Sequence, residues 1–191
     1  MKHLQFIILL LTLQFSFAAT GENSNVVDSF ISVLQSKDSI SVSKSIAYPS
    51  NYTPEQLAQD QQAIQSVYQA LFNKFGDIKE INTANDQSFY EVGATGGTIF
   101  WWASSNNAVT KKYVYSVNFS EFGKGFVKIY SSFDKNDEKI VGFYYGLPIN
   151  VQGSKIKAVN AMQLLLDGQG VPENHPFRKQ MLSDFPINKA E

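Results

Sequence analysis

The chain has 191 residues, a formal net charge of −1 and no cysteine. The lack of cysteine excludes disulfides, thiolate metal ligands and a cysteine nucleophile. The basic residues are scattered, so neither the net charge nor a basic run favours binding to nucleic acid. Stability therefore has to come from one packed core, for which the length suffices.

The first 18 residues have the layout of a secretory signal peptide. Lys2 and His3 precede an apolar run from Leu4 to Phe17, and Ser16 and Ala18 are the small residues that a cleavage site needs. The run is shorter than the about 20 residues of a membrane span, although an uncleaved anchor is the alternative. We expect cleavage near Ala18, a periplasmic or secreted mature protein, and no contact with the membrane afterwards. The missing cysteines favour a bacterial source.

Three segments after this leader are predicted to be helices or short turns. Residues 25–37 carry an apolar stripe at helical spacing, with Asn23 or Ser24 as the cap. Residues 39–46 alternate like a strand but are short and serine-rich, so a brief helical turn is the competing interpretation. Thr53-Pro54-Glu55-Gln56 has the pattern of a capping box with proline at the first helical position, and Gly76 ends the helix that it begins.

After Gly76 the apolar period changes to two, which predicts a meander of antiparallel strands. Phe122-Gly-Lys-Gly is expected to form a tight hairpin turn and residues 134–138 a looser one. The expected strands are 78–81, 88–93, 98–103, 112–122, 125–133 and 139–147.

The last part of the chain is predicted to add one helix, from Gly153 to near Gly168. The polar, proline-punctuated remainder is expected to be a frayed or surface-draped tail. The predicted organisation is therefore a signal peptide (1–18), an α+β roll domain (19–150) and a C-terminal helix and tail (151–191). The fold class is α+β, with N-terminal helices packed on a curved antiparallel sheet.

The strand at 98–103 is apolar on both faces, because Ile99 and Trp101 alternate with Phe100 and Trp102. Large aromatics also recur on neighbouring strands. One interpretation is coverage by the C-terminal helix and tail or by a second copy of the chain; the other is an aromatic-lined cavity for an apolar ligand. The candidate ligand-binding or interface residues are Trp101, Trp102, Tyr113, Tyr115, Phe143 and Tyr145.

The helix from Thr53 to Gly76, followed by Asp77-Ile and by the closing strands EFGKGFVKIYSSFDKNDEKIVGFYYGLP, resembles the cystatin-like roll of the nuclear transport factor and ketosteroid-isomerase superfamily. The resemblance covers about residues 24–148 and is greatest to small exported bacterial members. It implies sheet-to-sheet dimers, small-molecule pockets or accessory modules. Catalytic members rely on acidic, histidine or tyrosine side chains inside the cone. The segment after Leu147 departs from the family pattern.

The sequence offers few groups for catalysis. His175 is the only histidine after the leader and lies in the tail, which argues against a serine triad and a histidine zinc site. One enzymatic hypothesis remains: Glu91 or Glu121, buried near the aromatics, would act as a base while Tyr113 or Tyr115 polarises a carbonyl. An isomerase- or hydratase-like activity would follow.

The interpretation that the sequence favours is an exported, non-catalytic binding or accessory domain without metal or cofactor. Its partner would be a small apolar molecule or another protein. A homodimer through the aromatic sheet face and a periplasmic inhibitor- or immunity-type protein are the forms that a protein partner would take.

Overall fold

The computed structural model describes residues 24–92, 110–134, 137–168, 170, 172–183 and 187–188. The predicted leader and the strand expected at 98–103, with Trp101 and Trp102, lie outside the described residues.

The chain begins with two short helices whose ends are fixed by side-chain caps. Helix α1 covers Asn25–Ser36, and the Ser24 hydroxyl accepts a hydrogen bond from the Val27 amide. Helix α2 covers Ser39–Ser45, and the Asp38 carboxylate accepts hydrogen bonds from the Ile40 and Ser41 amides. The strand interpretation of residues 39–46 is therefore wrong, because the capping aspartate stabilises the helical alternative.

Helix α3, Pro54–Phe75, is the longest element, and its predicted signals are confirmed. The Thr53 hydroxyl and the Gln56 side chain form the reciprocal hydrogen bonds of a capping box. Gly76 ends the helix at a φ of 75°, where a side chain would be strained and would also collide with Ser120.

The strands form one antiparallel sheet with the order β1-β3-β4-β5-β2-β6. The predicted meander is confirmed for β3, β4 and β5 only. Strand β1 pairs with β3 and β2 pairs with β5, so β1 and β2, which follow each other in the chain, lie on opposite sides of these three strands. The strands are β1 (Ile78–Thr83), β2 (Phe89–Val92), β3 (Thr110–Phe119), β4 (Gly123–Asp134), β5 (Asp137–Pro148) and β6 (Ile187–Asn188).

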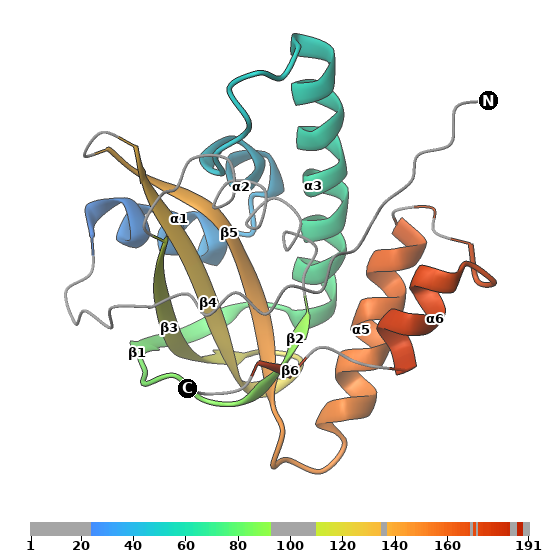
Figure 1. Cartoon of the computed structure of the whole chain (residues 1–191). Helices are drawn as coiled ribbons and strands as arrows, with labels where there is room; N and C mark the ends of the chain where they lie inside the picture. The colour runs from blue at the N-terminus through green and yellow to red at the C-terminus, as the bar shows by residue number, and fades with distance from the viewer. Residues whose placement is uncertain are drawn as a thin grey trace.

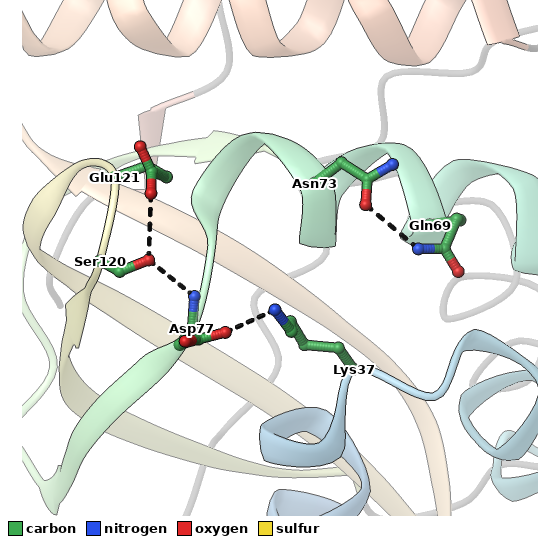
Figure 2. Close-up of polar contacts among 6 residues, drawn as sticks. All are labelled: Lys37, Gln69, Asn73, Asp77, Ser120 and Glu121. Carbon is green, nitrogen blue, oxygen red and sulfur yellow. Dashed lines mark hydrogen bonds and ion pairs between the residues drawn. The ribbon is translucent and has the colours of Figure 1, made fainter.

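The β3–β4 turn occurs earlier in the sequence than predicted. Phe119 pairs with Gly123, so residues 120–122 form the turn, and Gly125 lies within β4. The Phe119 ring packs over Gly125, where a Cβ atom would come within 2.6 Å of it. The Asp77 amide donates a hydrogen bond to the Ser120 hydroxyl (Figure 2), and the Ser120 amide donates one to the Asp77 carbonyl. These two bonds connect the turn to the residue that follows Gly76 at the end of α3.

The tail is more ordered than expected. Helix α5 covers Ser154–Gly168 and packs against α3, β2 and β5 (Figure 1). Helix α6, Pro176–Ser183, follows it, and Arg178 forms an ion pair with Asp167 of α5 at 2.5 Å. Strand β6 pairs with β2, so of the two predicted alternatives, frayed or surface-draped, the frayed one is wrong for the described part of the tail.

One hydrophobic core joins the helices to one face of the sheet. The buried side chains of α1, α3 and α5 form a single cluster with those of β3, β4 and β5. The α+β class, with helices on a curved antiparallel sheet and a C-terminal helix, is confirmed (Figure 1). No helix in the described ranges is both long enough and apolar enough to cross a membrane.

Candidate functional site

The predicted aromatic site residues on the described strands lie in the core. Tyr113, Tyr115, Phe143 and Tyr145 are between 0 and 6% exposed. All four belong to the cluster formed with the helices. They therefore pack on the helix-facing side of the sheet and expose almost no surface in the described part of the chain.

Helix α3 supplies the aromatic rings that fill this side of the sheet. Tyr68 stacks on Phe143 at 4.1 Å between ring centroids and donates a hydrogen bond from its hydroxyl to the Phe143 carbonyl at 3.0 Å. Phe75 packs edge-on against Tyr145 at 5.1 Å. Burial raises the pKa of Tyr145 well above its ordinary value, so this phenol stays protonated.

The two predicted pocket acids lie apart from these aromatics. Glu91 alternates with the core residue Val92 and pairs, at 2.9 Å, with Lys128 on the face of the sheet away from α3. Glu121 is exposed in the β3–β4 turn beside Ser120 (Figure 2). Glu91 thus lies on the opposite face of the sheet from the core residues Tyr113 and Tyr115, and Glu121 lies in an exposed turn.

A different glutamate does lie beside a tyrosine. The Glu138 carboxylate accepts hydrogen bonds from the Tyr113 hydroxyl at 2.8 Å and from the Ser131 hydroxyl at 2.5 Å. The cluster therefore links β3, β4 and β5 through one carboxylate.

A β-bulge explains why the sequence did not indicate Glu138. Strict alternation puts Ile140 and Glu138 on the face opposite Phe143. The pairing of Tyr130 with Gly142 and of Ser131 with Ile140 leaves Val141 as an extra residue. Ile140 consequently lies in the core with Phe143. Gly142 within the strand was the one signal of a bulge.

The pKa directions describe an anchored anion. Burial alone would raise the pKa of Glu138, but the hydrogen bonds from Ser131, Ser24 and Tyr113 outweigh it and hold the pKa below its ordinary value. Burial and the adjacent carboxylate raise the pKa of Tyr113. At neutral pH the glutamate is thus ionised and the tyrosine protonated, which suits a strong structural hydrogen bond better than proton transfer.

A groove of about 340 Å³ runs along α1 beside this cluster, a size within the range of small-molecule sites. Its apolar surface combines buried and half-buried side chains from α1 with Ile140 of β5, and the polar groups come from α1 and the end of α2. The lining residues are Asn25, Val26, Ser29, Phe30, Val33, Ser45 and Ile140.

The polar groups of the groove are uncharged and mostly acceptors. The Ser29 hydroxyl already donates to the Asn25 carbonyl at 2.8 Å, and the Ser45 hydroxyl donates to the Ser41 carbonyl at 2.7 Å. Each therefore retains lone pairs for a ligand donor. The Asn25 amide can both donate and accept. Within the described ranges, no group of three or more histidine, aspartate or glutamate side chains could hold a metal ion.

Comparison with known proteins gives one similarity at the level of the fold. No family model and no curated protein sequence matches the chain. Among solved structures, the chain is similar to a crystal structure described as a "Putative NTF2-like transpeptidase" from Campylobacter jejuni. The similarity covers 61% of this chain and 97% of that chain, with 16% sequence identity and a TM-score of 0.38. It concerns the fold alone and transfers no residue.

Proposed function

We propose that the protein is an exported binding module that holds a small, uncharged amphiphile in the groove between α1, the end of α2 and β5. The observation that carries the proposal is the groove itself, with an apolar floor and three polar residues at its edge. Export rests on the leader predicted at residues 1–18. The sequence pointed to an aromatic face of the sheet as the candidate ligand site. Because side chains of α3 pack on Phe143 and Tyr145 of that face, we propose the neighbouring groove as the site instead.

The apolar floor supplies the driving force. Phe30 and Ile140 form the base of the groove but are almost completely buried, so the surface that a ligand can cover belongs mainly to the half-buried Val26 and Val33. A ligand that covers this surface gains roughly 25 cal/mol for each Å² of apolar area removed from water. An elongated apolar body without charge matches this surface.

The polar edge selects the ligand's other end. Ser29 and Ser45 offer acceptor lone pairs, so the ligand must present a donor such as a hydroxyl or an amide N–H. None of the lining residues in the described ranges carries a charge that could pair with an ionised ligand. Desolvation of such a ligand would therefore go uncompensated. An alcohol should bind better than the carboxylate of the same skeleton.

A matched pair of probes tests this proposal. 2-Naphthol and 2-naphthoate share one ring system, but the first presents a neutral donor and the second an anion. We expect 2-naphthol to bind with a Kd on the order of 0.1–1 mM, a weak value ordinary for so small a ligand. We expect 2-naphthoate to bind at least about tenfold more weakly. Fluorescence titration gives the affinities, and amide shifts in NMR spectra locate the site.

Two serines of α1 provide a variant and its control. Ser29 and Ser32 are both exposed, and each donates to the carbonyl four residues before it, but only Ser29 lines the groove. Ser29→Trp should fill the groove and abolish 2-naphthol binding, while Ser32→Trp should leave the Kd unchanged. Equal affinities in both variants, or shifts that map to another surface, would reject the groove as the site.

A further inference from the structure

Hydrogen-bond donors and acceptors are unevenly distributed among the three polar side chains of the groove. The Ser29 hydroxyl donates to the Asn25 backbone carbonyl. The Ser45 hydroxyl donates to the Ser41 carbonyl, so both lining serines offer a ligand acceptor lone pairs. The Asn25 side chain takes part in no hydrogen bond within the described ranges, and its NH2 group carries two donors. Asn25 is thus the lining side chain that can donate to a ligand.

The polar and apolar lining groups are also separated along α1. Asn25, Ser29 and Val33 follow at intervals of four residues, so they lie in one row on one face of the helix. This row spans about 12 Å along the helix axis and changes from polar to apolar toward Val33. Val26 and Phe30 form an apolar row beside it. A ligand with one polar end therefore fits with that end beside Asn25 and Ser29 and its apolar body toward Val33.

The pattern of available donors and acceptors matches one class of neutral head group. A primary carboxamide has two N–H donors for the serine acceptors and one carbonyl oxygen for the Asn25 donors. A hydroxyl has one hydrogen to donate, so it cannot serve both serines at once. An ester has acceptors alone and leaves both serines without a donor. The carboxamide is the best match of the three.

We infer that the ligand of the groove is a neutral carboxamide with an apolar body, and that Asn25 determines this specificity by donating to the amide carbonyl. The inference rests on the proposed function and narrows the amphiphile to one head group. In this arrangement the amide nitrogen faces Ser29 and Ser45. The apolar body covers the half-buried Val26 and Val33.

Three probes with one ring system separate the head groups. 2-Naphthamide has donors and an acceptor, methyl 2-naphthoate has acceptors alone, and 2-naphthol tests the groove itself. An additional hydrogen bond of ordinary strength corresponds to roughly a fivefold change in Kd. We therefore expect 2-naphthamide to bind about fivefold more tightly than 2-naphthol. Methyl 2-naphthoate should bind at least about tenfold more weakly than 2-naphthamide, because it lacks both donors.

Asn25→Asp tests the assigned role with little change in side-chain shape. The substitution replaces the NH2 donor by a carboxylate oxygen, which can only accept. The carbonyl of 2-naphthamide then loses its partner and meets a negative charge, whereas the hydroxyl of 2-naphthol gains an acceptor. We expect the Kd of 2-naphthamide to rise about tenfold and that of 2-naphthol to stay the same or fall. The variant should remain folded, because an acidic residue in the first turn of α1 interacts favourably with the helix dipole.

Asn160→Asp is the matched control for charge. Asn160 is likewise an exposed asparagine in a helix, α5, but it does not line the groove. The substitution adds the same charge, so both Kd values and their ratio should stay at the wild-type level. An equal loss of 2-naphthamide binding in Asn25→Asp and Asn160→Asp would show that net charge causes the effect, and it would overturn the role of Asn25.

The outcomes separate the two proposals. If the wild-type protein binds none of the three probes in the groove, the proposed function falls, and the inference falls with it. If 2-naphthol binds in the groove but 2-naphthamide binds no more tightly than methyl 2-naphthoate, the proposed function stands and the inference is overturned. The inference is also overturned if Asn25→Asp keeps the wild-type ratio of the 2-naphthamide and 2-naphthol Kd values. A preference for 2-naphthamide that is lost in Asn25→Asp and kept in Asn160→Asp supports the inference.

Discussion

Glu138 shows how hydrogen bonding decides the ionisation state of a partly buried carboxyl group. Burial raises the pKa of a carboxyl, whereas three hydroxyl partners and the nearby Lys111 charge lower it, and the lowering is larger. The result is a partly buried anion at neutral pH. Stability should therefore depend on its ionisation.

The first prediction concerns acid unfolding. Because the folded pKa of Glu138 lies below the unfolded value of about 4.5, its contribution is fully present above that value and is lost as the pH falls through the folded pKa. In urea unfolding, Glu138→Gln should be less stable than wild type at pH 7, and the difference should shrink steadily below pH 4.5. Glu121→Gln, an exposed control, should track wild type. A difference between Glu138→Gln and wild type that stays constant down to pH 3 would contradict the prediction.

The second prediction concerns Tyr68, whose buried hydroxyl donates to the Phe143 carbonyl. Tyr68→Phe keeps the ring stack but deprives that carbonyl of this partner. We expect the free energy of unfolding to fall by about 1–2 kcal/mol. Urea denaturation at neutral pH measures the change, with near-ultraviolet circular dichroism as the check that the packing persists. A loss below about 0.3 kcal/mol would show that water or another donor replaces the hydroxyl.

At the level of elements, β2 and β5 fit together because Gly146 has no side chain. Gly146 lies opposite Glu91, and the neighbouring Phe89 ring lies over it. A Cβ atom built there would come within 2.3 Å of that ring. Phe89 is fully buried and also stacks on Phe126, so the ring has little freedom to move away.

The third prediction follows from this fit. Gly146→Ala should destabilise the protein by about 1–3 kcal/mol through overpacking. Phe89→Ala alone should cost more, about 3–5 kcal/mol, by leaving a cavity. In the double variant the new methyl group enters that cavity, so the combined loss should be smaller than the sum by about 1 kcal/mol or more. Strictly additive losses in thermal or urea unfolding would mean that the ring and the glycine do not share this space.

The sequence predicted the elements better than their partners. The capping box of α3, the stripe of α1 and the extent of α5 are local signals, and each element was placed within a residue or two of its true bounds. The pairing of β2 with β5 and β6 is non-local and left no such mark. The bulge at Val141 changes the face on which Glu138 lies, so the sequence did not indicate the hydrogen bond between Glu138 and Tyr113. Tyr113 had been predicted only as an aromatic ligand-binding or interface residue.

At the scale of the molecule, the C-terminal helix is part of the core. Ala158, Ala161, Met162, Leu165 and Leu166 of α5 are buried in the same cluster as the residues of α3 and the sheet. The predicted boundary near residue 150 therefore separates segments of sequence but not separate cores. The described part of the chain should unfold as one cooperative unit.

The fourth prediction tests this unit with two adjacent leucines. Leu165 is 2% exposed and Leu164 is 43% exposed. Leu165→Ala should lower the free energy of unfolding by about 2–5 kcal/mol, whereas Leu164→Ala should change it by less than about 0.5 kcal/mol. Far- and near-ultraviolet circular dichroism should report one shared transition in both variants. A separate early transition in Leu165→Ala would show that α5 melts independently of the sheet.

The strand order also determines when parts of the chain can fold. The pairs β3–β4 and β4–β5 join strands that follow each other directly in the sequence. Strand β2, in contrast, pairs with β5 and β6, which both come much later in the chain. Local hairpins close faster than distant pairings, so the β3–β4–β5 hairpins should form first and β2 should dock late. In a chain that emerges N-terminus first, Phe89 and Val92 stay uncovered until residue 148 has appeared, and this interval is when β2 is most open to pairing with a neighbouring chain.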